Sequence, residues 1–211
     1  LKEYKLKDQT KNPLTILVID TETTGFTVAD AEVIEVAGAE MKVDRKTGET
    51  FSITPIFDFL REPVRSKITE DITRVTSLTF QDVVNQVVDY DVLYDALHRC
   101  DILAAHHMGF DLPFMEDLAE ELVHKPKRCA CTCYDPLWNK LISPVTGRKF
   151  SAKKLTTILG ECGYKFPAHR AHNDVNATCT ALSLFPEAVK RLIAKASSDV
   201  IYQLDVKSVP W

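Results

Sequence analysis

Short apolar runs dominate the first part of the chain, and longer stretches of helical periodicity follow. Residues 14–19 are apolar except for Thr15, rich in β-branched side chains, and bounded by Pro13 and Gly25. A run of this kind is typical of a buried strand. Patterns along the whole chain predict strands near 14–20, 31–43, 49–57, 101–106 and 128–134, and helices near 79–99, 111–123, 136–142, 152–162 and 174–195.

This order of elements predicts an α/β fold. Three early strands, followed by helices that alternate with single strands, indicate a mixed sheet flanked by helices. Gly48 marks a hairpin turn between the second and third strands, and residues 55–67 are predicted to be a loop. The 211 residues contain no repeat, low-complexity tract or interdomain linker. We therefore predict one domain over residues 12–195, with residues 196–211 as a tail that packs on the domain or binds a partner.

Two carboxylates end the first predicted strand. Asp20 and Glu22 are two residues apart, so their side chains point to the same face of the strand. Open α/β sheets bind their ligands at the carboxyl ends of their strands. Like charges this close repel and are costly to desolvate, and one or two divalent cations would hold them. Taken alone, however, Asp-x-Glu more often means that the aspartate caps a turn.

Two further acids occupy comparable places later in the chain. Asp111 follows the short apolar run 102–104 and leads into a helical pattern, at a helix start where the dipole tolerates an anion. Asp174 lies at the start of another helical pattern, and His169 lies in the approach to it. These contexts favour a shared acidic site over isolated turn-capping residues.

Together these residues resemble the DEDDh, or DnaQ-like, 3′→5′ exonucleases, a family that includes the proofreading epsilon subunit of bacterial DNA polymerase III. The family motifs are Asp-x-Glu, His-Asn-x-x-Phe-Asp and His-x-x-x-x-Asp. The chain matches the first and third motifs and keeps Thr-Thr-Gly after the first. It departs from the second motif, where His107 replaces the usual asparagine. The resemblance extends over about residues 14–185 and implies a ribonuclease H-like mixed five-stranded sheet flanked by helices.

The resemblance also implies roles for the site residues. The implied cofactors are two divalent cations, Mg²⁺ or Mn²⁺, because two such ions suit phosphodiester hydrolysis. Asp20 would bridge both ions, Glu22 and Asp174 would complete the first, and Asp111 would support the second. His169 is implied as the general base, since histidine has a reference pKa suited to proton removal at neutral pH. Substrate contacts are expected from Thr23, Thr24, Gly25, Phe26 and His106.

The leading functional hypothesis is a metal-dependent 3′→5′ exonuclease that releases nucleoside monophosphates from single-stranded DNA ends in proofreading or repair. An exoribonuclease that trims RNA keeps the same chemistry, and a catalytically silent nucleic-acid-binding subunit is a third reading. A replication protein is a further candidate partner. Residues 202–206 partly resemble a clamp-binding peptide, but Lys207 stands where that peptide has phenylalanine.

Composition adds modest constraints. The net charge of −4 and the pI of about 5.9 are not those of a strongly basic nucleic-acid binder. Two basic clusters lie at 125–128 and 148–154. Each is either solvated surface or a contact for a nucleic-acid strand, and the second cluster is the better candidate for such a contact. Six cysteines, of which Cys129, Cys131 and Cys133 alternate, are expected to be free core thiols. With no apolar stretch that spans a bilayer, we expect no membrane contact and a cytoplasmic location.

Overall fold

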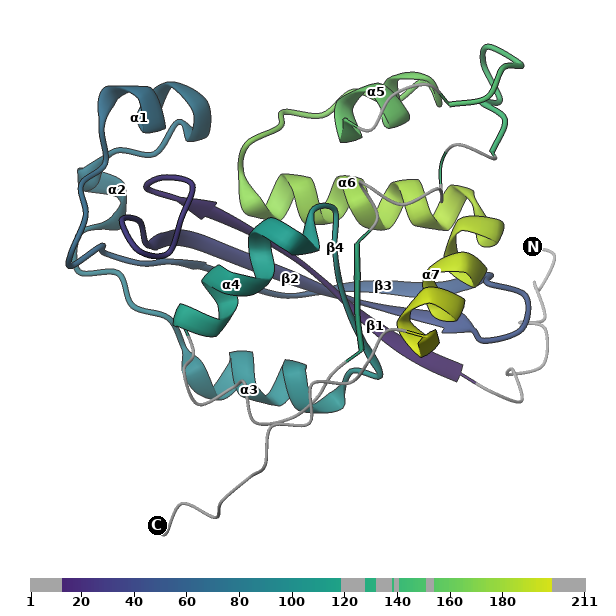
Figure 1. The fold of residues 1–211 in the computed structure, drawn as a ribbon, viewed down its shortest axis with the longest axis horizontal. Coiled ribbons are helices and arrows are strands. Elements are labelled where there is room, and N and C mark those ends of the chain that lie inside the picture. The colour runs from purple at the N-terminus through teal and green to yellow at the C-terminus, as the bar shows by residue number, and fades with distance from the viewer. Residues whose placement is uncertain (1–12, 119–127, 132–137, 139–140, 151–153, 199–211) are drawn as a thin grey trace, which may run out of the picture.

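The computed structural model describes residues 13–118, 128–131, 138, 141–150 and 154–198. A mixed sheet of five strands in the order β3-β2-β1-β4-β5 forms its centre (Figure 1). The strands are β1 (Pro13–Thr23), β2 (Val33–Asp44), β3 (Thr50–Leu60), β4 (Ile102–Ala105) and β5 (Arg128–Cys131). The first three pair antiparallel, whereas β4 pairs parallel with both β1 and β5. The predicted α/β class with a mixed sheet is confirmed.

Helices cover both faces of this sheet (Figure 1). They are α1 (Glu70–Thr76), α2 (Phe80–Val83), α3 (Tyr90–Arg99), α4 (Met108–Leu118), α5 (Leu155–Gly160), α6 (Ala171–Leu184) and α7 (Pro186–Ser198). Side chains alternate along β1, so Ile16 and Val18 join the core with α5, α6 and α7, while Leu17 and Ile19 join the core with α3 and α4. The strand β1 is therefore buried on both faces.

The acidic pair continues one of these apolar stripes. By the strand alternation, Asp20 and Glu22 follow Ile16 and Val18 on the face that packs against α6. In the ladder with β2, Asp20 lies opposite Ala37, and Glu22 lies opposite Glu35. The apolar core of this face thus gives way to carboxylates at the carboxyl end of β1.

The predicted helix over 79–99 is wrong, because two helices with a break at 84–89 occupy this segment. Asn85 adopts the left-handed conformation with φ of 59°, which an α-helix does not accommodate. Asp89 then starts α3, and its side chain accepts a hydrogen bond from the backbone N–H of Val92. Capping by Asp89 therefore fixes a new helix start inside the periodic pattern.

The predicted helix over 174–195 is likewise two helices. Pro186 opens α7, and a residue that precedes proline is disfavoured in the helical region, so α6 ends at Leu184. The helix α7 continues to Ser198, which is past the predicted domain end at residue 195. Residues 199–211, which include the peptide proposed to bind a clamp, lie outside the described part of the chain.

Two other local predictions need correction, and one helix was missed. The strand β3 continues to Leu60 through the segment predicted as a loop, because Pro55 lies on an edge strand, where a missing N–H is tolerated. The helix α1 was not predicted; Thr69 caps it by accepting a hydrogen bond from the N–H of Ile72. Within the predicted helix 136–142, Ile142 instead forms an isolated β-bridge with Lys149.

The described residues also bear on membrane-spanning helices, the cysteines and the second basic cluster. Within the described residues, no helix is long and apolar enough to cross a membrane. No disulfide joins the described cysteines, Cys100, Cys162 and Cys179. The side chains of Cys129 and Cys131, and all of Cys133, lie outside what the structure describes. In the second basic cluster, Arg148, Lys149 and Lys154 are exposed.

Candidate active site

Three carboxylates meet at the carboxyl end of β1. Asp20 and Glu22 project from the strand, and Asp174 projects from the first turn of α6. One oxygen from each of the three side chains lies within 4.8 Å of the others. All three side chains are half-buried. This set of hard oxygen donors fits a divalent cation, because its mutual repulsion is otherwise uncompensated.

Asp111 approaches the same strand from the other helical layer. It lies in the first turn of α4, is only 2% exposed, and is not one of the three clustered carboxylates. Its Oδ1 accepts hydrogen bonds from Thr21, from the backbone N–H at 3.0 Å and from the side-chain hydroxyl at 2.9 Å. The sequence analysis missed Thr21, whose place between Asp20 and Glu22 turns its side chain to the opposite face of β1. Thr21 thus fixes Asp111 beside the acidic pair.

The electrostatics of the site favour protonation of its acids in the absence of a cation. Burial, followed by repulsion from Asp111 and Asp174, raises the pKa of Asp20 well above its ordinary value. Burial and the neighbouring carboxylates raise the pKa of Glu22 to about 8. Burial raises the pKa of Asp111 to about 7, although the bonds from Thr21 act against this shift. Burial also raises the pKa of Asp174. Such clustered shifts are typical of functional sites.

His169 lies on an exposed segment directly before α6. Its backbone N–H donates to Oδ2 of Asp174 at 2.7 Å, so the two predicted site residues are in direct contact. Its φ of 67° lies in the left-handed region, which is uncommon for a residue with a Cβ. The exposed imidazole is therefore carried by a strained backbone that is anchored to one of the clustered acids.

The Thr-Thr-Gly segment forms an ordered turn after the acidic pair. The hydroxyl of Thr23 donates to the carbonyl oxygen of Gly25 at 2.6 Å, and the N–H of Thr24 donates to the carbonyl oxygen of Glu32 at 2.9 Å. Phe26 is 90% exposed, so the alternative that it packs in the core does not apply. Its bare ring on an ordered turn is free to meet a ligand.

The two histidines before α4 lie in the turn that follows β4. Both His106 and His107 are half-buried, and desolvation lowers the pKa of His107. The ring of His107 stacks near that of Phe110, with 6.1 Å between their centres. Phe110 in turn packs beside Phe114 in the core under α4. This turn therefore fixes the start of α4, and with it Asp111.

A buried acid that the sequence analysis missed joins two loops beside the site. The side chain of Glu32, 1% exposed, accepts hydrogen bonds from the backbone N–H groups of Val64, Arg65 and Ser66 at 2.6–3.2 Å. The hydroxyl of Ser66 also bonds Glu32 and lies 2.7 Å from the hydroxyl of Thr24. Glu32 thus ties the loop after β3 to the turn that carries Phe26.

Replacing this acid is expected to destabilise the fold. Burial alone would raise the pKa of Glu32, but its hydrogen bonds from Ser66, Val64 and Arg65 outweigh burial and lower the pKa to about 2. In Glu32→Gln the new amide turns a donor toward N–H groups, and we expect a loss of about 3 kcal/mol in the free energy of unfolding. The melting temperature should fall by roughly 6–12 °C.

The pH dependence gives this prediction a second test. A lowered pKa contributes stability above the ordinary glutamate pKa of 4.5, and that stability is lost as the pH falls toward 2. Thermal unfolding of Glu32→Gln and wild type should therefore differ most near neutral pH and converge in acid. The exposed Glu49→Gln is the control. A melting temperature of Glu32→Gln equal to that of this control at pH 7 would contradict the role of Glu32.

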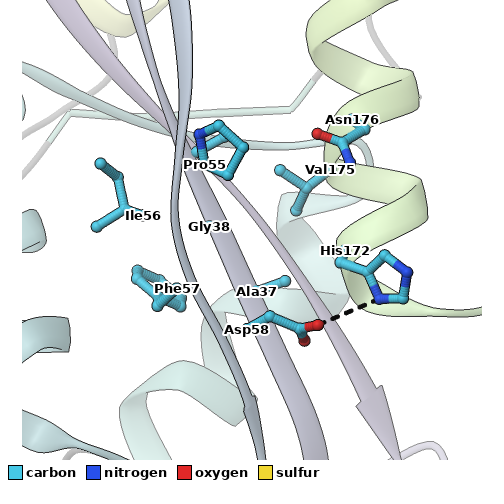
Figure 2. A pocket seen from close by; sticks show the side chains of 10 residues that line it. Ala37, Gly38, Pro55, Ile56, Phe57, Asp58, His172, Val175 and Asn176 are labelled. Atoms are coloured by element: carbon cyan, nitrogen blue, oxygen red, sulfur yellow. Dashed lines mark ion pairs between the residues drawn. The ribbon is translucent and has the colours of Figure 1, made fainter.

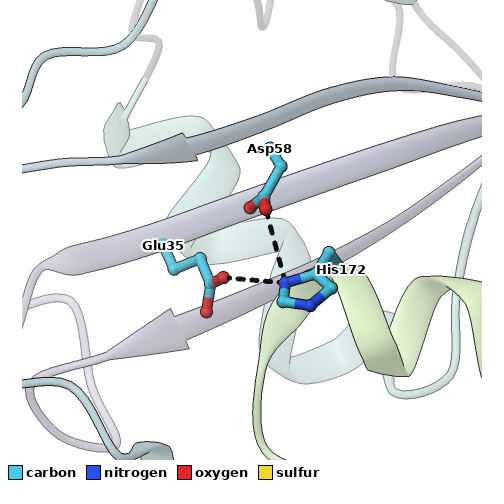
Figure 3. Close-up of side chains that lie close together, drawn as sticks. All are labelled: Glu35, Asp58 and His172. Atoms are coloured by element: carbon cyan, nitrogen blue, oxygen red, sulfur yellow. Dashed lines mark hydrogen bonds and ion pairs between the residues drawn. The ribbon is translucent and has the colours of Figure 1, made fainter.

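A second group of possible metal ligands lies nearby, where β2 and β3 meet α6. An open pocket of about 230 Å³ has Asp58 and His172 in its lining (Figure 2). The Nδ1 of His172 lies 3.3 Å from Oε1 of Glu35 and 3.3 Å from Oδ2 of Asp58 (Figure 3). Glu35 is already paired with the guanidinium of Arg170 at 3.0 Å, and that charge would repel a cation. We therefore interpret this group as a hydrogen-bonded ion-pair network.

Comparison with known proteins relates the sequence of this chain to exonucleases. The family model RNase_T, described as Exonuclease, matches residues 17–182. A DNA polymerase III of the PolC type from Mycoplasma pneumoniae is 28% identical over 190 residues, which cover 88% of this chain and 12% of the relative. Its counterpart from Mycoplasma genitalium is 25% identical over 205 residues, which cover 95% of this chain and 13% of the relative. The chain therefore spans only a small part of these curated relatives.

Solved structures share the fold at low sequence identity. Exonuclease I of E. coli in complex with a dA16 oligonucleotide matches with a TM-score of 0.61 at 18% identity, covering 86% of this chain and 42% of that one. A full-length 3′-exonuclease matches with a TM-score of 0.56 at 16% identity, covering 89% of this chain and 65% of that one. These likenesses support the ribonuclease H-like architecture of the sheet and its helices.

Proposed function

Because the chain belongs to the DnaQ-like exonuclease family represented by RNase_T, we propose that it is a metal-dependent 3′→5′ exonuclease. Its products would be nucleoside monophosphates released from the 3′ ends of single-stranded DNA. The observation that carries this proposal is the convergence of Asp20, Glu22 and Asp174, with oxygens within 4.8 Å of one another, beside a histidine on an exposed segment.

The carboxylates are proposed to hold two divalent cations, Mg²⁺ or Mn²⁺. Asp20, Glu22 and Asp174 would hold one ion, and Asp20 and Asp111 would serve the second. When bound, such ions lower the pKa of a water molecule and neutralise charge on the phosphate. The raised pKa of Glu22, about 8, supports this assignment, because it reflects burial together with repulsion from neighbouring carboxylates, and a bound cation would offset both.

His169 is proposed as the general base. Its imidazole would accept a proton from the water that attacks phosphorus, while the bond from phosphorus to the 3′ oxygen of the preceding nucleotide breaks. The contact between the N–H of His169 and Asp174 supports this role, because it keeps the residue at the acidic cluster. An exposed position also gives the proton a direct path to solvent.

Single-stranded DNA is the proposed substrate. Phe26, 90% exposed on the turn after the acidic pair, offers an aromatic face on which any base can stack. Thr23, Thr24, Gly25 and His106 are the other proposed contacts. The similarity to PolC-type DNA polymerases and to an exonuclease crystallised with DNA favours DNA over RNA and a proofreading or repair role. Association with a replication protein, residence in the cytoplasm and a tail beyond the exonuclease domain remain part of the proposal.

Strand digestion tests this function. DNA and RNA oligonucleotides labelled at the 3′ or the 5′ end would be incubated with the protein in Mg²⁺, Mn²⁺ or EDTA. We expect the 3′ label to be released at once as a mononucleotide from DNA, no reaction in EDTA, and a ladder of shortened 5′-labelled products. Faster trimming of RNA would favour the exoribonuclease alternative. An absence of products with every cation would contradict the proposal and favour a silent binding subunit.

A further inference from the structure

We propose that the ion pair between Glu35 and Arg170 is a positioning device that holds His169 and Asp174 in place for catalysis. This inference rests on the proposed exonuclease function and assigns a role to two residues outside the acidic cluster. Neither Glu35 nor Arg170 is a proposed metal ligand. Their role would be to set the geometry of the segment that carries the general base.

Glu35 makes an unusually complete set of hydrogen bonds for a buried acid. Its side chain is 0% exposed on β2. Arg170 donates to both of its oxygens, from Nε at 3.0 and 3.2 Å and from Nη2 at 3.0 Å. The backbone N–H of Ala171 donates a further bond at 3.0 Å, and Nδ1 of His172 lies 3.3 Å away. Bidentate pairs of this kind fix orientation as well as distance.

These contacts fasten the start of α6 to the sheet at its catalytic end. Arg170 is the N-cap residue of α6, and Glu35 lies directly opposite Glu22 in the strand ladder. The carbonyl oxygen of Arg170 accepts the N–H of Asp174 at 3.0 Å. Asp174 in turn accepts the N–H of His169. Arg170 is therefore joined to Asp174 by a hydrogen bond and to His169 by a peptide bond.

The backbone of His169 explains why such a fastening is needed. A φ of 67° is costly for a residue with a side chain and persists only where the surroundings enforce it. The bond to Asp174 holds His169 from the helix side, and the pair with Glu35 holds the next residue from the sheet side. Without the second anchor, the segment would relax and the imidazole would leave its position.

The charges of Glu35 and Arg170 also affect the acidic cluster. Glu35 adds a carboxylate next to a cluster that already holds several, because it lies directly opposite Glu22 in the strand ladder. The guanidinium of Arg170 balances the charge of Glu35. Removal of Arg170 would therefore leave a buried, uncompensated charge and disturb the cation-binding residues, in addition to freeing His169.

The test is a double-mutant cycle with two readouts. Arg170→Gln, His169→Ala and their combination would be compared with wild type in turnover at saturating Mn²⁺ and in Mn²⁺ binding by calorimetry. We expect Arg170→Gln to lower turnover by about 10²-fold, the usual cost of misplacing a catalytic group. In the His169→Ala background the same change should cost less than about threefold, because the base that it positions is gone. Mn²⁺ affinity should fall by roughly three- to tenfold through Asp174.

The matched control is Arg99→Gln, which removes another arginine that pairs with a glutamate of β2, Glu40, at 3.0 Å. It should leave turnover and Mn²⁺ binding unchanged. Arg170→Lys keeps the charge without the bidentate fork, so it should recover less than half of the lost turnover. If Arg170→Gln does not fold, Arg170→Lys replaces it in the comparison.

Two results would overturn the positioning role: an Arg170→Gln enzyme as active as Arg99→Gln, or equal losses in both His169 backgrounds. Inactivity of the wild type would count against the proposed function instead. In that case unchanged Mn²⁺ binding by Arg170→Gln would still overturn the positioning of Asp174.

Discussion

Asp20→Asn is expected to abolish hydrolysis while leaving the fold intact. The side chain would keep its size and its place on β1, but the amide would lose the charge that a divalent cation requires. Because Asp20 is the acid proposed to serve both cations, no neighbouring carboxylate can replace it. Release of labelled mononucleotides from a 3′-labelled oligonucleotide in Mg²⁺ measures the effect.

The same substitution should stabilise the protein in the absence of metal. Acids with raised pKa values bind protons more tightly in the folded state, so the metal-free protein loses stability as the pH rises from about 4, the reference value for free carboxylic acids. That loss continues to the pKa of Glu22, about 8. Asp20→Asn removes one repelling charge, and its gain in melting temperature over wild type should therefore be larger at pH 8 than at pH 5.

The control for both measurements is Glu116→Gln, which neutralises an exposed acid of α4. Glu116→Gln should retain full activity and show no pH-dependent gain in melting temperature. The assignment of Asp20 as a metal ligand would be contradicted if Asp20→Asn kept more than a few per cent of the hydrolysis rate in a preparation free of contaminating nuclease. A melting temperature that falls equally at both pH values would show that the carboxylate is stabilising.

His169→Ala is expected to lower turnover by about 10²–10⁴-fold, which is the usual contribution of a positioned general base. Mn²⁺ binding should be little affected, because the hydrogen bond from His169 to Asp174 comes from the backbone N–H, which alanine keeps.

His98→Ala is the control here, because His98 is an exposed histidine on α3, away from the acidic cluster. Unchanged turnover of His169→Ala at saturating Mn²⁺ would exclude His169 as the base. A large loss of Mn²⁺ affinity would instead indicate that His169 acts on the metal site.

The sequence predicted those features of the fold that depend on local pattern. The apolar run 14–19 lies in the central strand β1, and the order of strands and helices gave the correct class. Helix boundaries were less predictable, since periodicity alone does not register the left-handed Asn85 or the proline that opens α7. Both breaks replace one predicted helix by two.

The candidate site was likewise predictable only where it depends on local sequence pattern. The spacing of Asp20 and Glu22 indicated a shared face, and the motif order indicated that Asp174 joins them. By contrast, the bonds from Thr21 to Asp111, from residues 64–66 to Glu32, and from Arg170 to Glu35 join segments that are remote in sequence. No periodicity records such pairings, because each depends on which elements the completed sheet brings together.

The arrangement of the sheet also has a consequence for synthesis of the protein. The acids of β1 leave the ribosome before the other strands of the sheet. The strand β1 lacks its parallel neighbour until β4 follows, and Asp174 emerges later still, with α6. Chains grow from the amino end, and partners distant in sequence meet only after both have emerged. A nascent chain that still lacks α6 therefore holds the acidic pair without its third carboxylate or its histidine. The proposed nuclease activity would therefore begin only after α6 has been translated.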